Sequence, residues 1–278
     1  MSLLSKAINS VAVSLASPII SRRDAQQNHQ GFSYRTYLFL ARIVKHFFYR
    51  TMQKDGDFTR SIYGVWLKRR DDNTYTYCVN GNYGFAYSEH LKKIRHDFTF
   101  LDIGSNIGLY SLVALRNSNC KDVHCFDPDS ATIPYLTANL QRTGTSIFRV
   151  HPYAVSSSAG TAILNKESGH SGASTLATPT FESSAAETVT TVDHNYLDEL
   201  LAHTQRPICL KLDVEGHEMT VLTTLAQSSI INQVKEVFAE FNPAMSDTKA
   251  MQQWFTSNGF TRKWRIGSDQ HWDALYSR

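Results

Sequence analysis

The chain has 278 residues, of which 42% are hydrophobic, and its 28 basic and 25 acidic residues leave a formal net charge of +3. This composition is typical of a soluble protein with mainly one core, large enough for a full α/β domain and an appendage. No apolar run approaches the length that crosses a bilayer, which excludes a membrane-spanning class of protein.

The positions of the charged residues and of the cysteines bear on the possible partners of the protein and on its location in the cell. Residues 1–70 hold twelve of the basic and only three of the acidic residues, whereas the rest of the chain is net acidic. Such a basic segment meets nucleic acid, a membrane surface or a phosphorylated substrate, or it forms a solvated helical face. The four cysteines lack disulfide or metal spacing, so reduced core thiols and a cytoplasmic location are expected.

The first 23 residues contain no acid and are rich in serine, with a short apolar stretch that resembles a weak targeting signal. Polar residues interrupt this stretch and no clear cleavage site follows, so a helical or disordered extension is favoured. From Tyr34 to Tyr49, apolar residues recur at helical spacing among cations, which predicts a basic amphipathic helix. Such a helix docks on its own catalytic domain, the usual outcome, or makes peripheral contact with anionic lipid.

Two aromatic and β-branched runs follow, at 63–68 and 75–79, around a polar turn, and they predict a β-hairpin. A second turn at 80–84 leads to a helix near 88–94. Residues 1–95 are therefore predicted to form a basic N-terminal extension of helix and hairpin, and a second domain is predicted at 96–278.

From residue 96 onward, strand-like and helix-like patterns alternate, which predicts a parallel sheet with helices on both faces. Strands are expected at 100–103, 122–126, 147–151, 207–213 and 234–241, helices at 106–117, 130–142, 216–226 and 247–258, and a closing antiparallel hairpin at 260–266 and 272–276.

One long interruption separates the third and fourth of these strands. Residues 165–187 contain fourteen Ser, Thr, Ala or Gly among twenty-three residues. Such a composition buries little, so a structureless loop is expected. Because ligands bind at strand ends in open α/β sheets, a substrate lid is favoured over an idle insertion.

The turn after the first strand of this domain predicts a cofactor site. An apolar run ends at Asp102 and turns through Gly104 and Gly108 into a helix, which brings backbone amides to a ligand. Asp127 closes the next strand, where a carboxylate can accept hydrogen bonds from both ribose hydroxyls of an adenosine. Asp102 would repel a phosphate but attract the ammonium of S-adenosylmethionine (SAM), so a SAM site is predicted.

A second cluster of polar residues lies around the fourth strand. Lys211 and Asp213 share one face of an otherwise apolar strand, so Lys211 is expected to meet Asp213, Asp102 or Glu240. Glu215, His217 and Glu218 follow at the strand end, although acids there also suit a helix N-terminus.

These motifs resemble the FkbM family of SAM-dependent methyltransferases. The resemblance rests on 102–108, 126–129, 154–156 and 211–218 and covers about 96–245. It implies the α/β class I methyltransferase Rossmann-like fold with a mostly parallel seven-stranded sheet, and O-methylation of a sugar or polyketide hydroxyl. The family more often has glutamate at Asp127. The cofactor residues that it implies are Asp102, Gly104, Ser105, Asn106, Gly108 and Asp127, with Ala154 and Val155 near adenine.

Removal of the proton from an acceptor hydroxyl requires a base or a metal. His217 is the best neutral-pH base by type. Alternatively, Asp213, Glu240 and Asn242 supply hard oxygen ligands from neighbouring strand ends for Mg²⁺, as in catechol-type methyltransferases. The predicted catalytic residues are accordingly His217, Asp213 and Glu240.

Three functions remain open on the sequence. The leading one is a SAM-dependent O-methyltransferase acting on a sugar or other small-molecule acceptor. The second is a nucleic-acid methyltransferase, supported only by the basic N-terminal region, because no aromatic residues alternate with that charge to stack bases. The third is a SAM-binding protein without catalytic activity.

Overall fold

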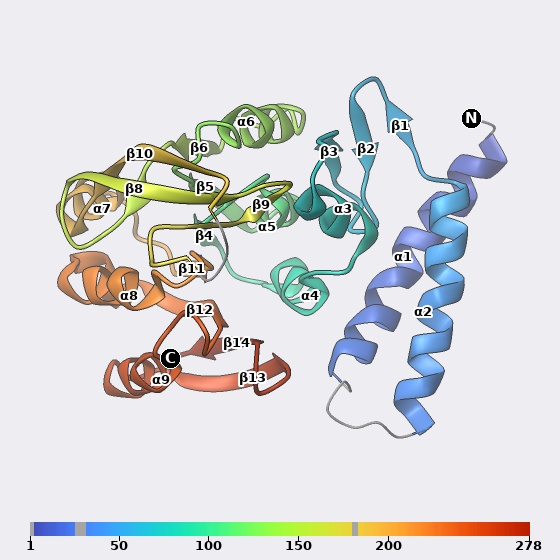
Figure 1. Cartoon of the computed structure of the whole chain (residues 1–278). Helices are drawn as coiled ribbons and strands as arrows, with labels where there is room; N and C mark the ends of the chain where they lie inside the picture. Colours follow the sequence, from blue (N-terminus) through green and yellow to red (C-terminus); the bar gives the residue numbers. More distant parts are fainter. Residues whose placement is uncertain (1–2, 26–31, 180–182) are drawn as a thin grey trace.

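The computed structural model describes residues 3–25, 32–179 and 183–278, and a seven-stranded sheet lies at its centre (Figure 1). The strand order is β13-β14-β12-β11-β4-β5-β6, and neighbours pair in parallel except β14, which is antiparallel to both β12 and β13. The predicted mostly parallel sheet with a C-terminal hairpin is confirmed. The strands are β4 (Phe98–Ile103), β5 (Cys120–Phe126), β6 (Phe148–His151), β11 (Ile208–Leu212), β12 (Val234–Phe241), β13 (Thr261–Gly267) and β14 (Trp272–Ser277).

Helices cover both faces of this sheet, and alternate strand residues point into two separate hydrophobic clusters. In β4, for example, Phe100 belongs to one cluster and Leu101 to the other. Every β4 residue is buried, which explains why the strand sequence is nearly continuous in apolar residues. One face packs against α4 (Phe85–Lys93), α5 (Leu109–Ala114) and α6 (Ile133–Gln141), and the other against α7 (His194–Leu201), α8 (Glu218–Gln227), the 3₁₀ helix η1 (Ser229–Asn232) and α9 (Thr248–Ser257).

The N-terminal segment packs on the α4–α5 side of the molecule. Helix α1 (Leu3–Ala25) and helix α2 (Phe32–Arg50), which contains the predicted amphipathic helix, lie side by side as a hairpin (Figure 1). Helix α1 buries Ala12, Ala16 and Ile20, whose spacing of four residues keeps them on one face. These residues belong to the same hydrophobic cluster as Phe100, so the N-terminal segment and the sheet share a core.

The predicted hairpin at 63–68 and 75–79 is wrong. The hairpin is formed instead by β2 (Phe58–Arg60) and β3 (Trp66–Lys68), with β1 (Lys54–Asp55) at its edge. The second predicted strand lies in α3 (Asn73–Asn80). Asp72 caps this helix by accepting a hydrogen bond from the Tyr75 amide at 2.7 Å, and Gly81 ends it in the left-handed conformation. These caps outweigh the strand propensity of the aromatic run between them.

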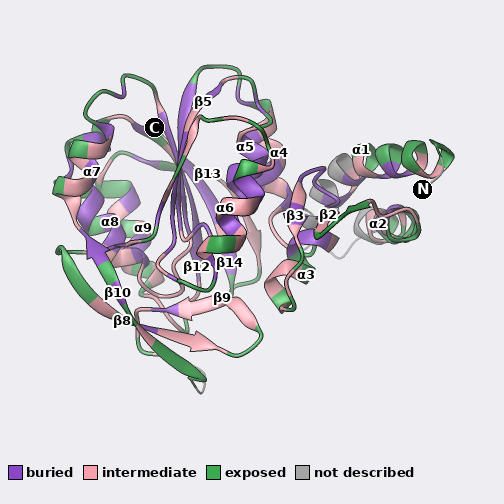
Figure 2. Ribbon diagram, turned by 90° about the horizontal axis from the view of Figure 1, so that it is seen from above, coloured by how far each residue is buried: buried purple, intermediate pink, exposed green. Residues whose placement is uncertain are grey.

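The expectation of a structureless loop at 165–187 is also wrong for the part that the structure describes. A four-stranded sheet of order β7-β10-β8-β9 occupies this region. Its strands are β7 (Ala154–Val155), β8 (Gly160–Glu167), β9 (His170–Thr175) and β10 (Ala185–Val192). This sheet is much less buried than the central sheet (Figure 2). Its small polar residues are ordered by backbone pairing between β8 and β10 and not by burial. Residues 180–182 of the predicted lid lie outside the described residues.

All four cysteines are buried and unpaired, as expected from their spacing. In the described part of the chain, no helix combines the length and hydropathy needed to span a membrane.

Candidate active site

A cavity opens at the carboxyl ends of the central strands. Its walls come from the β4–α5 turn, the end of β5, the loop after β11 and the end of β12, with β7, β9 and α3 completing the enclosure. Of the predicted site residues, the lining includes Gly104, Ser105, Asn106, Asp127, Ala154, Val155, Asp213, His217 and Glu240. The predicted residues Asp102, Gly108 and Asn242 are not among the residues that line it.

The floor of the cavity is the turn at Gly104. This residue has a φ of +80°, and a Cβ atom there would lie 1.8 Å from the Asp213 carbonyl oxygen, so only glycine fits. The Lys211 ammonium donates a hydrogen bond to the Gly104 carbonyl at 2.5 Å. The turn is therefore fixed from both sides by the loop and strand that carry the second motif.

Asp102 lies beneath this turn. One carboxylate oxygen accepts a hydrogen bond from Ser111 at 2.5 Å, and the other lies 3.9 Å from the Lys211 ammonium without a hydrogen-bond partner among the described residues. Burial raises the pKa of Asp102, although Lys211 and Ser111 oppose this effect. Lys211 meets Asp102 and Asp213, as predicted, and Asp102 does not reach the cavity itself.

Asp127 presents its carboxylate to the cavity from the end of β5. Each of its oxygens accepts one backbone hydrogen bond, from Asn106 at 2.7 Å and from Asp129 at 3.0 Å. Burial raises the pKa of Asp127 to about 6, against the effect of these two amides. Each oxygen retains a lone pair for a further donor.

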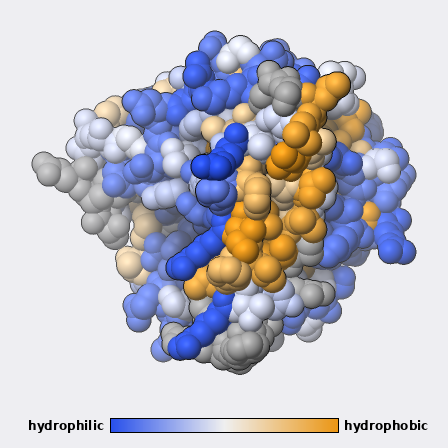
Figure 3. All heavy atoms as spheres, turned by 90° about the vertical axis from the view of Figure 1, so that its right-hand side faces the viewer, coloured by the Kyte–Doolittle hydropathy of each residue, from blue (hydrophilic) through white to orange (hydrophobic). Residues whose placement is uncertain are grey.

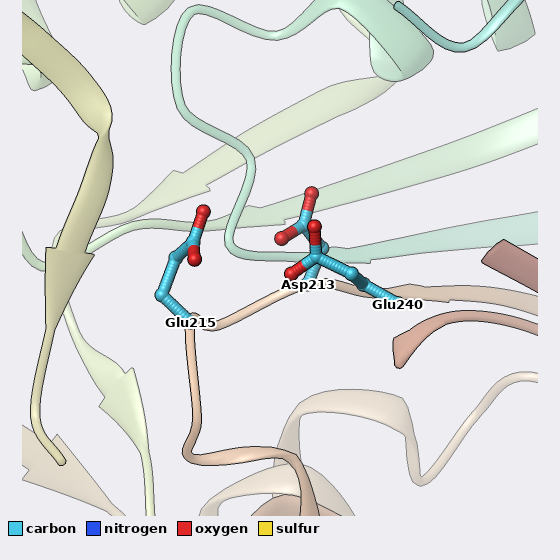
Figure 4. Close-up of side chains that lie close together, drawn as sticks. All are labelled: Asp213, Glu215 and Glu240. Carbon is cyan, nitrogen blue, oxygen red and sulfur yellow. The ribbon is translucent and has the colours of Figure 1, made fainter. Parts of the chain in front are cut away.

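Three further carboxylates that line the cavity lie close together. Asp213 and Glu215 follow β11, Glu240 comes from β12, and one oxygen of each lies within 4.8 Å of the others (Figure 4). Glu215 adopts a left-handed φ of +51°, which is unusual for a residue other than glycine and aims its side chain at the other two. We call these three residues the acid cluster.

The members of the acid cluster differ in their partners. Asp213 binds Lys211 at 3.3 Å and accepts a hydrogen bond from the Tyr83 hydroxyl, so its pKa is lowered in spite of burial. Burial and the Asp213 charge raise the pKa of Glu240 to about 8, while a 2.6 Å contact with His271 opposes that shift. Burial and its two neighbours in the cluster raise the pKa of Glu215 to about 10.

His217 lines the same cavity at the start of α8. Its Nε2 atom lies 3.1 Å from the Ser156 hydroxyl, and burial lowers its pKa, which favours the neutral ring. Glu218 has a different task, because its carboxylate accepts hydrogen bonds from the Val214 and Gly216 amides and holds the loop after β11. This agrees with the alternative that an acid at this position serves the helix N-terminus.

Sequence reasoning missed two cavity residues. Glu215 lies beside Asp213 and Glu240, whereas Asn242 is not among the residues that line the cavity and its side chain accepts a hydrogen bond from the Ala244 amide. The alternation of Asp213 and Glu215 just past the strand was the available signal. Tyr83 lies in a turn 130 residues before Asp213, and nothing in the sequence indicated that it reaches the cavity.

Strand β9 forms the roof of the cavity and contacts three of its walls. The Ser171 hydroxyl lies 3.3 Å from the Asn106 side chain, the Gly172 amide donates to Thr74 of α3 at 2.8 Å, and Thr175 donates to the Glu215 carbonyl at 2.5 Å. Its neighbour β8 is held by Lys166, which bridges Asp129 at 2.6 Å and Glu187 at 2.5 Å.

A family model and a curated relative match part of the chain. Residues 102–262, more than half of the chain, match the family model described as the methyltransferase FkbM domain. A curated relative, the hexuronic acid methyltransferase AglP of Haloferax volcanii, is 28% identical over 155 residues, which cover 55% of this chain and 61% of the relative. The chain therefore matches less than two thirds of that relative's length.

Solved structures of other methyltransferases show a more distant likeness. The ribosomal protein L11 methylase of Lactobacillus delbrueckii subsp. bulgaricus is 12% identical, with 70% of this chain and 80% of that chain covered and a TM-score of 0.39. M. capricolum TrmK, in complex with S-adenosyl-homocysteine, is 11% identical, with 69% and 67% covered and a TM-score of 0.40. These two carry no argument about activity. The family match does, and the chain belongs to the FkbM methyltransferase family.

Proposed function

We propose that the protein is a SAM-dependent O-methyltransferase that modifies a hydroxyl group of a sugar or another small-molecule acceptor. The observation that carries the proposal is that one cavity is lined by Asp127, by the acid cluster and by His217. The family supports methyl transfer, and the name of the hexuronic acid methyltransferase relative supports a sugar acceptor.

The residues that are present fit the cofactor. When bound, SAM supplies a methyl group that its sulfonium has already activated. The free lone pairs of Asp127 suit the two ribose hydroxyls, and the glycine turn at Gly104 leaves room for close approach to the backbone. Ala154 and Val155 offer an apolar wall for adenine. Because Asp102 lies below the turn, Asp213, whose pKa is lowered and which is therefore ionised, is the better partner for the cofactor ammonium.

Two routes remain for removing the acceptor proton. His217 is half-buried with a lowered pKa, which favours the neutral ring that a general base requires, and it lies on the cavity wall. The acid cluster instead brings three carboxylate oxygens together, which suits a Mg²⁺ ion that would hold and acidify the hydroxyl. In this second route Glu215 replaces Asn242 beside Asp213 and Glu240.

A roofed cavity favours a small acceptor or a terminal sugar. Strand β9 covers the site, and the rings of Tyr77, Tyr153 and His170 line it together with hydroxyl groups from Thr74 and Ser171. Apolar rings with a few hydrogen-bonding groups are typical of a small-molecule site.

The test is transfer of a radiolabelled methyl group from SAM to separate pools of uronic acid-containing glycans, nucleic acid and lipid. We expect label in the glycan pool, and much less label with the Asp127→Asn variant at a SAM concentration that does not saturate it. Label only in nucleic acid would favour the second function. Tight SAM binding without transfer to any pool would favour the third.

A further inference from the structure

The outer face of the α1–α2 hairpin carries an apolar stripe. It consists of Leu4, Val11 and Leu15 of α1 and Phe39, Ile43 and Phe47 of α2, which are between 39% and 70% exposed. The three α2 residues are spaced four apart, so they form a continuous row along the helix. Figure 3 shows hydrophobic residues gathered on this side of the molecule with hydrophilic residues beside them. Soluble proteins rarely expose contiguous apolar patches without a partner for them.

The stripe is not the face by which α2 docks on its own domain. Ala41, Val44 and Phe48 are buried on the opposite side of the helix. Lys45 fixes α2 in place, because its ammonium donates to the Asn82 side chain at 2.6 Å and the Gly81 carbonyl at 3.3 Å. The docking predicted for this helix therefore uses one face and leaves a second apolar face outward.

Cations accompany the stripe. Arg35 and Arg42 are seven residues apart on one edge of the row, and Arg50 continues it at the end of the helix. All three are exposed, and among the described residues none has a carboxylate within ion-pair distance. The sequence of residues 1–50 contains seven basic residues and one acid, Asp24.

This charge pattern favours an anionic lipid surface over a second copy of the chain as the partner. A second copy packed on the stripe would add a second set of arginines to the interface, and residues 1–50 of that copy would supply only one acid, Asp24, to balance them. An anionic lipid headgroup supplies the complementary charge, while the phenylalanine and aliphatic side chains enter the boundary of the acyl chains. Because no described helix is long and apolar enough to span a membrane, the helices would lie along the surface.

We propose that the stripe and its arginines dock the protein peripherally on a membrane surface that contains anionic lipid. The surface is already formed in the folded protein, because the inner face of α2 and Lys45 hold the helix in position. Docking therefore requires no folding of the helix at the membrane. The proposal does not depend on the methyl acceptor.

The test is flotation of the full-length protein with vesicles of phosphatidylcholine, with and without phosphatidylglycerol. We expect binding only to the anionic vesicles, with affinity that falls as salt rises. The double variants Phe39→Ser/Phe47→Ser and Arg42→Glu/Arg50→Glu should each bind at least tenfold more weakly. Their thermal transitions should remain near that of the wild type, because all four side chains are exposed.

Matched controls come from exposed residues elsewhere. Ile163→Ser removes an apolar side chain that is 52% exposed on β8, and Arg206→Glu/Lys249→Glu reverses two exposed charges away from the hairpin. Both should float like the wild type. The proposal fails if wild-type protein stays in solution with anionic vesicles, or if control and stripe variants lose binding equally. A dimer that the Phe39→Ser/Phe47→Ser variant disperses, without vesicle binding by the wild type, would assign the stripe to a second copy instead.

Discussion

At the scale of single residues, Gly104 links the fold to the cofactor site most directly. Gly104→Ala forces a left-handed φ on alanine and drives its Cβ into the Asp213 carbonyl. We expect loss of SAM binding by calorimetry and a clear fall in the melting temperature. Gly144→Ala is the matched control, because Gly144 has a φ of +75° but nothing within 4 Å of a Cβ. It should cost only about 1 kcal/mol, and an equal effect of both variants would contradict the close-approach argument.

The second residue-scale prediction concerns Asp127 and pH. Its pKa of about 6 means that the carboxylate gains a proton as pH falls through that value, and with it loses acceptor capacity for ribose hydroxyls. SAM affinity should therefore decline below about pH 6. Asp127→Asn should weaken binding by roughly thirty- to hundredfold and flatten this pH dependence.

The Asp127 variant needs a control for stability, because the Asn106 and Asp129 amides both donate to this carboxylate. Asp198→Asn provides one, since Asp198 likewise accepts hydrogen bonds from Ser228 and Ser229 but lies outside the cavity lining. It should reduce stability without changing SAM affinity. Unaltered affinity in Asp127→Asn would overturn the ribose assignment.

The third residue-scale prediction separates the two routes of proton removal. If His217 is the base, His217→Ala should lower turnover by about two to four orders of magnitude, with SAM affinity retained and EDTA without effect. In that case turnover should not decline until the pH is lower than 6.5, the ordinary pKa of histidine, because burial lowers the pKa of His217. If a metal acts, EDTA should abolish activity, Mg²⁺ should restore it, and Asp213→Asn should be the most damaging variant. Full activity of both His217→Ala and EDTA-treated protein would exclude both routes.

At the scale of elements, the β7–β10 sheet is held over the cavity by few contacts, and Lys166 is the main charged one. Lys166→Met leaves Asp129 and Glu187 facing each other without their shared cation. We expect faster amide exchange in β8 and β9, faster proteolysis at 176–179, and protection by SAM. Lys92→Met, which removes a pair within α4, should change none of these. Unchanged exchange in Lys166→Met would show that backbone pairing alone holds the roof.

The same elements show how far the sequence predicts the fold. Strands buried on both faces, such as β4, have strong apolar runs, and the alternation of strand and helix in the second half was confirmed. Helix α3 was missed because Tyr75–Val79 has strand propensity, although Asp72 and Gly81 marked both helix ends. The β8–β10 pairing was missed because small polar residues carry little strand propensity, and because the pairing joins residues 19 or more apart in the sequence, Lys166 and Ala185 being the nearest pair.

The candidate site likewise contains residues that the sequence predicts and a residue that it does not. Motif residues at strand ends, such as Asp127 and Asp213, were predictable because parallel strands deliver their carboxyl ends to one edge of the sheet. Glu215 was not predicted as a neighbour of Asp213 and Glu240, because side-chain direction in a loop depends on the left-handed backbone at Glu215. Sequence spacing does not reveal that conformation.

At the scale of the whole molecule, the hydrophobic core crosses the predicted boundary at residue 96. Ala16 of α1 and Leu91 of α4 share a cluster with Phe100 and Cys209 of the sheet. A fragment of residues 96–278 should therefore expose this face, aggregate on size-exclusion chromatography and lose the cooperative thermal transition of the full chain. A fragment that unfolds cooperatively at the temperature of the full chain would show that the second domain is autonomous.

The hydrogen bond from Tyr83 to Asp213 places a common evolutionary constraint on the segments before and after residue 96. The donor lies before residue 96 and the acceptor after it, so neither segment can be exchanged between homologues without regard to the other. A chimera with a foreign N-terminal segment would retain the acid cluster and lose the hydroxyl that helps to keep Asp213 ionised. We therefore expect positions 83 and 213 to covary within the family, with a hydroxyl donor at the first wherever the second is an aspartate.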